Sequence, residues 1–168
     1  MKARILALAA LLLAPAAASA QQPIEQSGTI AHQAAGTGFA ERIGEFQRSN
    51  ATRFDSAGHN VAASYNWYPP GGRVLVTVYV YPAPPAVAAA RARHCRDQFD
   101  QARAAVTTQF KDARVVEQGP APTMAGAEPA LGHRSVLRFR TLFGSAEQDV
   151  RSEVRLYCYV GGDWLVKY

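Results

Sequence analysis

The chain has 168 residues and a formal net charge of +5 at pH 7, from 18 Lys and Arg against 13 Asp and Glu. This length indicates one domain, which is large enough to form a core and to bury about 70% of the surface that the unfolded chain exposes. Lys2 and Arg4 lie in an N-terminal leader, so the rest of the chain carries +3 (5 − 2). This small positive excess does not favour a nucleic-acid partner, and no apolar run is long enough to span a bilayer.

The first twenty residues have the three parts of a secretory signal peptide. A positively charged start precedes an apolar run over residues 5–13, and Ala-Ser-Ala at 18–20 is a small-residue cleavage pattern. We therefore expect cleavage before Gln21 and a product that is periplasmic or secreted. Residues 1–20 are excluded from the fold on this basis.

Residues 21–38 are rich in Gln, Ala and Gly and have little apolar periodicity, so we expect a flexible N-terminal segment there. A single domain then covers 39–168. Its first part has a mixed pattern, which predicts one turn of helix or a bent strand from Phe39 and a strand near 46–53.

Two strictly alternating runs, 61–67 and 74–80, flank a Pro-Pro-Gly-Gly turn and predict a hairpin. Placing Tyr68 opposite Arg73 sets its register and brings the apolar residues of both strands to one face. The predicted pairs are Trp67 with Val74, Tyr65 with Val76, Ala63 with Val78 and Val61 with Val80.

A long helix is predicted from Pro85 to about Lys111, because this stretch has good helix formers and lacks Gly and internal Pro. Its charged side carries both signs, and Asp100 can pair with Arg96 or Arg103 one turn away. One apolar stripe recurs at helical spacing and predicts the buried face: Cys95, Phe99, Ala102, Val106 and Phe110.

The remaining residues predict further strands. A short strand near 114–117 precedes a Gly- and Pro-rich loop to 129, and strands over 133–141 and 150–160 flank a turn at 144–148. The chain stops at Tyr168 inside a strand-like run, which is either a short edge strand or the start of a longer segment.

These elements predict an α+β domain, with one antiparallel sheet of about five to seven strands and one long helix packed on its inner face. Cys95 and Cys158 both lie on the apolar side of their elements, so this packing brings the two thiols together. In an oxidising compartment they would form a disulfide. The bridge closes a loop of 63 residues, worth at most about 4 kcal/mol.

Reactive sites have little support in the sequence. A Cys95 nucleophile beside His94 is disfavoured, because neighbouring helix positions point about 100° apart. The histidines, at 32, 59, 94 and 133, do not have the spacing of metal ligands. A triad of Asp55, Ser56 and His59 is too compact for catalytic geometry, and no nucleotide or phosphate loop is present. We expect no metal and no cofactor.

The strongest surface clue is a set of Tyr and Arg residues on the polar sides of two strands. If these strands share a sheet, its outer face is aromatic and basic, and suits an anionic or carbohydrate ligand or a protein partner. The alternative is an ordinary half-exposed strand face, or one covered by another element. The candidates are Arg73, Tyr79, Tyr81, Arg155, Tyr157 and Tyr159.

Four short runs carry a resemblance to known proteins: residues 39–46, 78–82, 157–159 and 162–164. In pattern, the mature chain resembles small exported bacterial proteins that have no assigned activity. The order of strands, one long helix and more strands is also similar to PsbP-like domains, which are not catalytic. This second resemblance implies an architecture and no binding residues.

The sequence thus favours an exported, non-enzymatic binding or accessory protein of the bacterial envelope, with an unknown envelope ligand or protein as partner. The alternative is a small envelope hydrolase whose site is assembled from distant residues, with His59, His94 or His133 as base. A histidine within hydrogen-bond reach of a Ser, Asp or Glu in a pocket would favour the hydrolase.

Overall fold

The computed structural model describes residues 21–143 and 146–168. The predicted leader and residues 144–145, which fall in the predicted turn, lie outside the described residues. The elements of the described chain are β1 (Gln22–Pro23), β2 (Ile30–His32), the 3-10 turn η1 (Gln33–Ala35), β3 (Thr37–Phe39), β4 (Arg42–Ile43), β5 (Phe46–Arg53), β6 (Val61–Trp67), β7 (Val74–Pro82), α1 (Ala88–Gln109), β8 (Arg114–Pro120), η2 (Pro129–Leu131), β9 (Gly132–Phe143), β10 (Ala146–Val160) and β11 (Trp164–Lys167).

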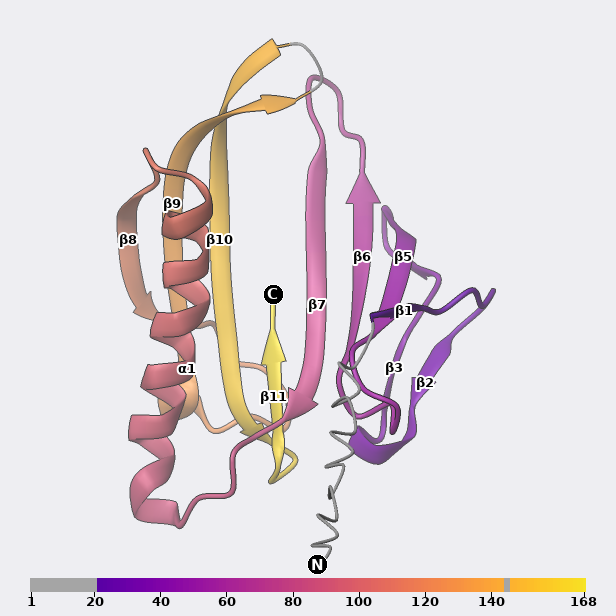
Figure 1. Cartoon of the computed structure of the whole chain (residues 1–168), viewed down its shortest axis with the longest axis vertical. Helices are drawn as coiled ribbons and strands as arrows, with labels where there is room; N and C mark the ends of the chain where they lie inside the picture. The colour runs from indigo at the N-terminus through magenta and orange to yellow at the C-terminus, as the bar shows by residue number, and fades with distance from the viewer. Residues whose placement is uncertain (1–20, 144–145) are drawn as a thin grey trace, which may run out of the picture.

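In the described part of the chain, nine strands form one antiparallel sheet in the order β1-β5-β6-β7-β11-β10-β9-β8, and β4 pairs with β5 (Figure 1). Strand makes up 49% of the structure and helix 19%. The α+β class is therefore wrong, and the fold is predominantly β. The expected five to seven strands were too few, because the N-terminal residues and β4 add short strands that have no clear alternation.

The hairpin of β6 and β7 has the predicted register. Trp67 pairs with Val74, and the pairing continues without a shift to Val61 opposite Val80. A one-residue slip would move the apolar side chains of a strand to its other face, so burial of the apolar set specifies this register. The helix and the strands on either side of it also lie where the sequence places them.

The sheet has two cores on opposite faces, where a single inner face was expected. On β11, Leu165 packs in the first core, while its neighbours Trp164 and Val166 pack in the second. Neighbouring residues of a strand point to opposite faces. The first core lies under α1, which covers β9 and β10 (Figure 1). The second core covers β5, β6 and β7 with residues of β2 and β3.

The N-terminal segment forms this second layer, although the sequence predicts flexibility there. Ile30, His32 and Phe39 are buried, and β2 pairs with β3. The Arg48 guanidinium holds the layer on the sheet by donating to the carbonyl oxygens of Gln26 (2.6 Å) and Phe39 (2.5 Å). Few apolar residues are involved, so composition alone does not reveal that the segment packs.

The disulfide between Cys95 of α1 and Cys158 of β10 is present and confirms the predicted pairing. Both residues are buried in the first core, with exposed fractions of 1% and 0%. The apolar stripe of the helix lies on the same side as Cys95, and Phe99 is buried beside it. The bridge therefore joins the helix to the sheet inside the first core.

β11 is much shorter than the strands beside it. It pairs with residues 79–82 of β7 and with Leu156, Tyr157 and Val160 of β10. Over residues 21–143 and 146–168, no helix is both long and apolar enough to cross a membrane.

Candidate binding site on the sheet face opposite the helix

The six predicted surface residues do not share one face. Tyr81 packs in the core under α1, and Tyr79, two residues away on β7, points to the same side of the sheet. Arg73 lies just before β7, at the turn end of the hairpin. Tyr157 instead pairs with Val166, on the face opposite α1, and Arg155 lies on that face as well. Alternation fixes the faces within one hairpin, but β7 and β10 are separated by β11, and its pairing decides how their faces match.

The tyrosines of β10 are also less exposed than a docking surface requires. Tyr157 and Tyr159 are each 4% exposed. The Tyr157 hydroxyl donates to the Pro122 carbonyl oxygen at 2.9 Å, and the Tyr159 hydroxyl donates to that of Pro84 at 3.3 Å. A buried Tyr finds a partner for its hydroxyl in this way. These two side chains attach loops to the sheet and do not form an exposed aromatic face.

The bulge in β10 explains how Tyr159 reaches the helix side. The backbone of Tyr159 is left-handed, with φ of 56°, and the pairing register of β10 with β11 shifts between Tyr157 and Val160. Cys158 and Tyr159 consequently both pack in the core under α1. In this core the Arg91 guanidinium lies over the Tyr159 ring, 4.7 Å from the ring centroid, in a cation–π contact.

The face opposite α1 carries a groove of about 300 Å³. Its floor is formed by β6, β7 and β11, one wall by the N-terminal layer, and the other wall by the loop after β8 and the end of β10. Its lining residues are Ala35, Thr37, Gly38, Phe39, Ile43, Tyr65, Val78, Val80, Met124, Ala125, Val160, Gly161, Trp164, Val166 and Tyr168.

Trp164 is held at one side of the groove by the N-terminal layer. The His32 ring meets it edge-on at 4.9 Å between centroids. His32 Nδ1 accepts from the Ala35 amide at 3.1 Å, so Nε2 carries the proton and donates to the His59 carbonyl oxygen at 3.1 Å. His32 is thus a buried, hydrogen-bonded support for the groove wall.

Tyr168 marks the end of the groove nearest β10. Its ring meets the Tyr157 ring edge-on at 6.1 Å, and its hydroxyl lies 3.6 Å from the Met124 sulfur. The backbones of Tyr168 and Arg155 exchange two hydrogen bonds, of 2.9 and 3.2 Å. The Arg155 side chain therefore begins directly beside this end of the groove.

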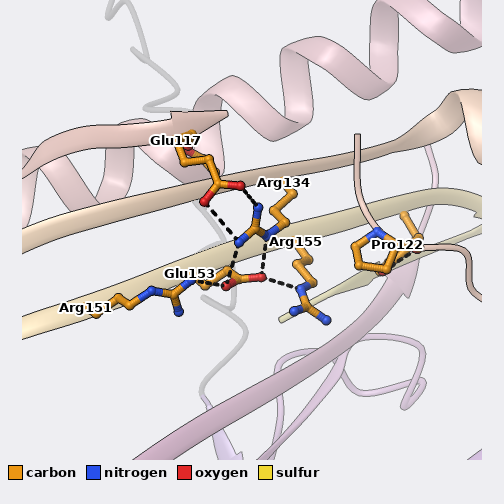
Figure 2. Close-up of polar contacts among 8 residues, drawn as sticks. Glu117, Pro122, Arg134, Arg151, Glu153 and Arg155 are labelled. Carbon is orange, nitrogen blue, oxygen red and sulfur yellow. Dashed lines mark hydrogen bonds and ion pairs between the residues drawn. The ribbon is translucent and has the colours of Figure 1, made fainter. Parts of the chain in front are cut away.

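A charged cluster continues on the same face, over β8, β9 and β10. Arg134 lies between the carboxylates of Glu117 and Glu153, as Figure 2 shows, and donates to both. Its Nε lies 2.7 Å from Glu153 Oε1. Arg155 and Arg151 approach Glu153 from its two sides, at 2.6 and 3.1 Å (Figure 2).

Ion pairing keeps both carboxyl groups charged. The hydrogen bond from Arg134, reinforced by Arg155, lowers the pKa of Glu153 to about 2. The hydrogen bond from Arg134 also lowers the pKa of Glu117. A general acid needs a pKa near the working pH, so this carboxylate pair is suited to holding arginines in place and not to proton transfer.

The histidines do not meet the geometric condition for the hydrolase alternative. In the described ranges, no histidine side chain donates to or accepts from a Ser, Asp or Glu side chain. The His133 ring lies against the Phe99 ring at a tilt, 5.3 Å between centroids, and its Nε2 is buried without a partner, as is Nδ1 of His94. No group of three potential metal ligands is present among the same residues.

A second, more polar hollow of about 320 Å³ lies at the ends of β5 and β6. Arg73 lies beside it, where it donates to the Asn66 side chain at 2.7 Å and stacks over Tyr68. Its lining residues are Glu45, Gln47, Arg48, Ser49, Asn66, Trp67 and Tyr68. This hollow and the groove have no lining residue in common.

Sequence reasoning missed most of the groove and the centre of the charged cluster. Short segments far apart in the chain supply the groove: Phe39 lies on β3, whereas Trp164 begins β11 and Tyr168 follows that strand directly. Glu117 and Arg134 lie on strands that pair only in the fold. Comparison with protein-family models, with curated proteins and with solved structures finds no significant match to this chain.

Proposed function

We propose that this chain is an exported, non-enzymatic binding protein of the bacterial envelope, and that its ligand occupies the groove opposite α1. The observation that carries the proposal is the groove itself. About 300 Å³ is at the small end of the range for small-molecule sites, and a largely apolar and aromatic lining with few polar groups is typical of them.

Two features support export. The first twenty residues have the pattern of a cleavable leader. The Cys95–Cys158 disulfide is buried in the first core, and such bridges persist in oxidising compartments.

Export is tested by expressing the full chain in a bacterial host and fractionating the cells. The expected result is a periplasmic or secreted protein whose mass is that of a chain beginning at Gln21. It should have no free thiol when it is denatured without reductant. Replacing both Ala18 and Ala20 with Leu should block cleavage and leave the precursor at the membrane. An uncleaved, full-length protein that remains in the cytoplasm would refute export.

Binding in the groove is tested with the uncharged apolar dye N-phenyl-1-naphthylamine, whose emission rises in an apolar site. Ala125→Phe places a ring in the groove from an exposed loop position and should reduce dye binding tenfold or more. Ala130→Phe is the matched control, because Ala130 is exposed and does not line the groove. Equal binding by both variants would exclude the groove as the site.

A further inference from the structure

We propose that the ligand of the groove is a single-chain amphiphile with an anionic head, whose chain lies in the groove and whose head binds Arg155. This inference rests on the proposed function and specifies the ligand class. It depends on two observations: the lining of the groove, and the charges beside one of its ends.

The lining contains no Asp, Glu, Lys or Arg. A ligand that fits the groove is therefore uncharged over most of its length. The volume of about 300 Å³ corresponds to roughly ten methylene-sized groups, taking about 30 Å³ for each as for a water molecule. A chain of eight to twelve carbons matches this size.

The charge beside Tyr168 is positive. Arg155 lies directly opposite Arg134 across the β9–β10 ladder, and Arg151 lies directly opposite Arg138. Like charges in such positions repel each other. Four arginines against Glu117 and Glu153 leave an excess of two positive charges (4 − 2) on this part of the face, and an anion would relieve the repulsion.

Arg155 has the donors to hold that anion. Its Nε donates to Glu153, which fixes the orientation of the guanidinium group. Within residues 21–143 and 146–168, its two terminal nitrogens have no protein acceptor, and the side chain is 40% exposed. A planar guanidinium whose two terminal nitrogens are free suits a carboxylate or phosphate.

The arginine that contacts Phe39, at the other end of the groove, is already engaged. Arg48 donates to the carbonyl oxygens of Phe39 and Gln26 in the N-terminal layer. The head of an amphiphile therefore has a free cationic partner at the Tyr168 end. This fixes the direction of the ligand, with its tail toward Phe39 and its head beyond Tyr168.

The test uses the fluorescence of Trp164, which lines the groove. The chain has two tryptophans, so Trp67→Phe leaves Trp164 as the single reporter. This protein is titrated at pH 8 with decanoate, decanol and decyltrimethylammonium below their aggregation limits. Decanoate should bind at least tenfold more tightly than decanol, and the cation should bind most weakly.

Three variants assign the head to its residue. Arg155→Gln should lower the affinity for decanoate to that for decanol, while Arg155→Lys restores part of the difference. Binding of N-phenyl-1-naphthylamine should not change in either variant. Arg93→Gln, an exposed position on α1, is the control for loss of one positive charge.

The outcomes separate this inference from the proposed function. Equal affinities for decanoate and decanol, or no effect of Arg155→Gln, would overturn the anionic head while the groove remains a binding site. Failure of every alkyl-chain probe and of the uncharged dye would instead reject the groove and with it the proposed function.

Discussion

Glu153 has the most strongly perturbed carboxyl group on the sheet. It accepts hydrogen bonds from Arg134, Arg151 and Arg155, and its side chain is 18% exposed. A half-buried carboxylate with three such donors stabilises the fold only while it is ionised. The same contacts hold Arg155 in the orientation that the proposed ligand requires.

The pKa of Glu153 predicts a defined loss of stability in acid. It is about 2 in the folded protein and near 4.5 in the unfolded chain, so its contribution is complete above pH 4.5 and is lost as the pH falls toward 2. Glu153→Gln should lower the free energy of unfolding at pH 7 by on the order of 2 kcal/mol, reduced by partial solvent screening. Urea denaturation at pH 7 and pH 3 measures this difference, which should shrink at the lower pH.

Glu147→Gln is the matched control, because Glu147 pairs with Arg140 on the same two strands but is 54% exposed. An exposed pair of this kind contributes roughly 0–1 kcal/mol. If the two variants lose equal stability at pH 7, the cluster around Glu153 has no special role.

The lowered pKa of His133 predicts a loss of stability in a different pH range. Burial against Phe99, together with the charge of Arg96, lowers its pKa below 6.5, and Asp100 opposes this shift. The unfolded chain therefore binds a proton first as the pH falls, and stability is lost from about pH 6.5 downward. His133→Phe should lose less stability than the unmodified protein between pH 7.5 and pH 5. An identical loss in both would show that His133 does not contribute.

At the scale of elements, the disulfide is the covalent part of the contact between α1 and β10. Cys95→Ala with Cys158→Ala should lower the free energy of unfolding by up to about 4 kcal/mol, the limit for a loop of 63 residues. The double variant should also become insensitive to dithiothreitol in urea denaturation, whereas the unmodified protein loses stability on reduction. Equal stability with and without the bridge would contradict this expectation.

The elements themselves were largely predictable from local patterns. Alternation in residues 61–67 and 74–80 gave the register of β6 and β7, and the stripe through Cys95 gave the buried side of α1. Each signal comes from residues near in sequence, which share one element or one turn. The disulfide also followed, because both cysteines were on apolar sides.

Which face each strand shows to the helix was not predictable in this way. β7 and β10 lie on either side of β11, a four-residue strand that comes after both of them in the chain. Its pairing puts Tyr79 on the α1 side and Tyr157 on the other. The predicted aromatic and basic surface consequently divides into two, and its tyrosines on β10 are buried.

At the scale of the whole molecule, the two cores lie on opposite faces and toward opposite ends of the sheet. Figure 1 shows α1 beside β9 and β10, and β2 and β3 at the other end of the sheet, near β5. A helix crosslinked to β10 covers one core. A small layer covers the other, and its β2 and β3 have three residues each. The groove lies at the edge of this small layer, so ligand binding should depend on the second core more than on the first.

A pair of matched core substitutions tests this division. Phe39 and Phe99 are both buried, at 4% and 1% exposure, in the second and first core respectively. Truncating either to Ala should cost about 3–5 kcal/mol by creating a cavity. Phe39 also lines the groove, so Phe39→Ala should abolish binding of N-phenyl-1-naphthylamine in the absence of urea. Phe99→Ala should keep that binding until the sheet itself unfolds, because the N-terminal layer contacts the opposite face and the disulfide still attaches α1.

Dye binding and circular dichroism, followed together through a urea titration, distinguish the two cases. Loss of dye binding by Phe99→Ala before any loss of secondary structure would mean that the cores are coupled through the sheet and that the small layer does not control the groove alone.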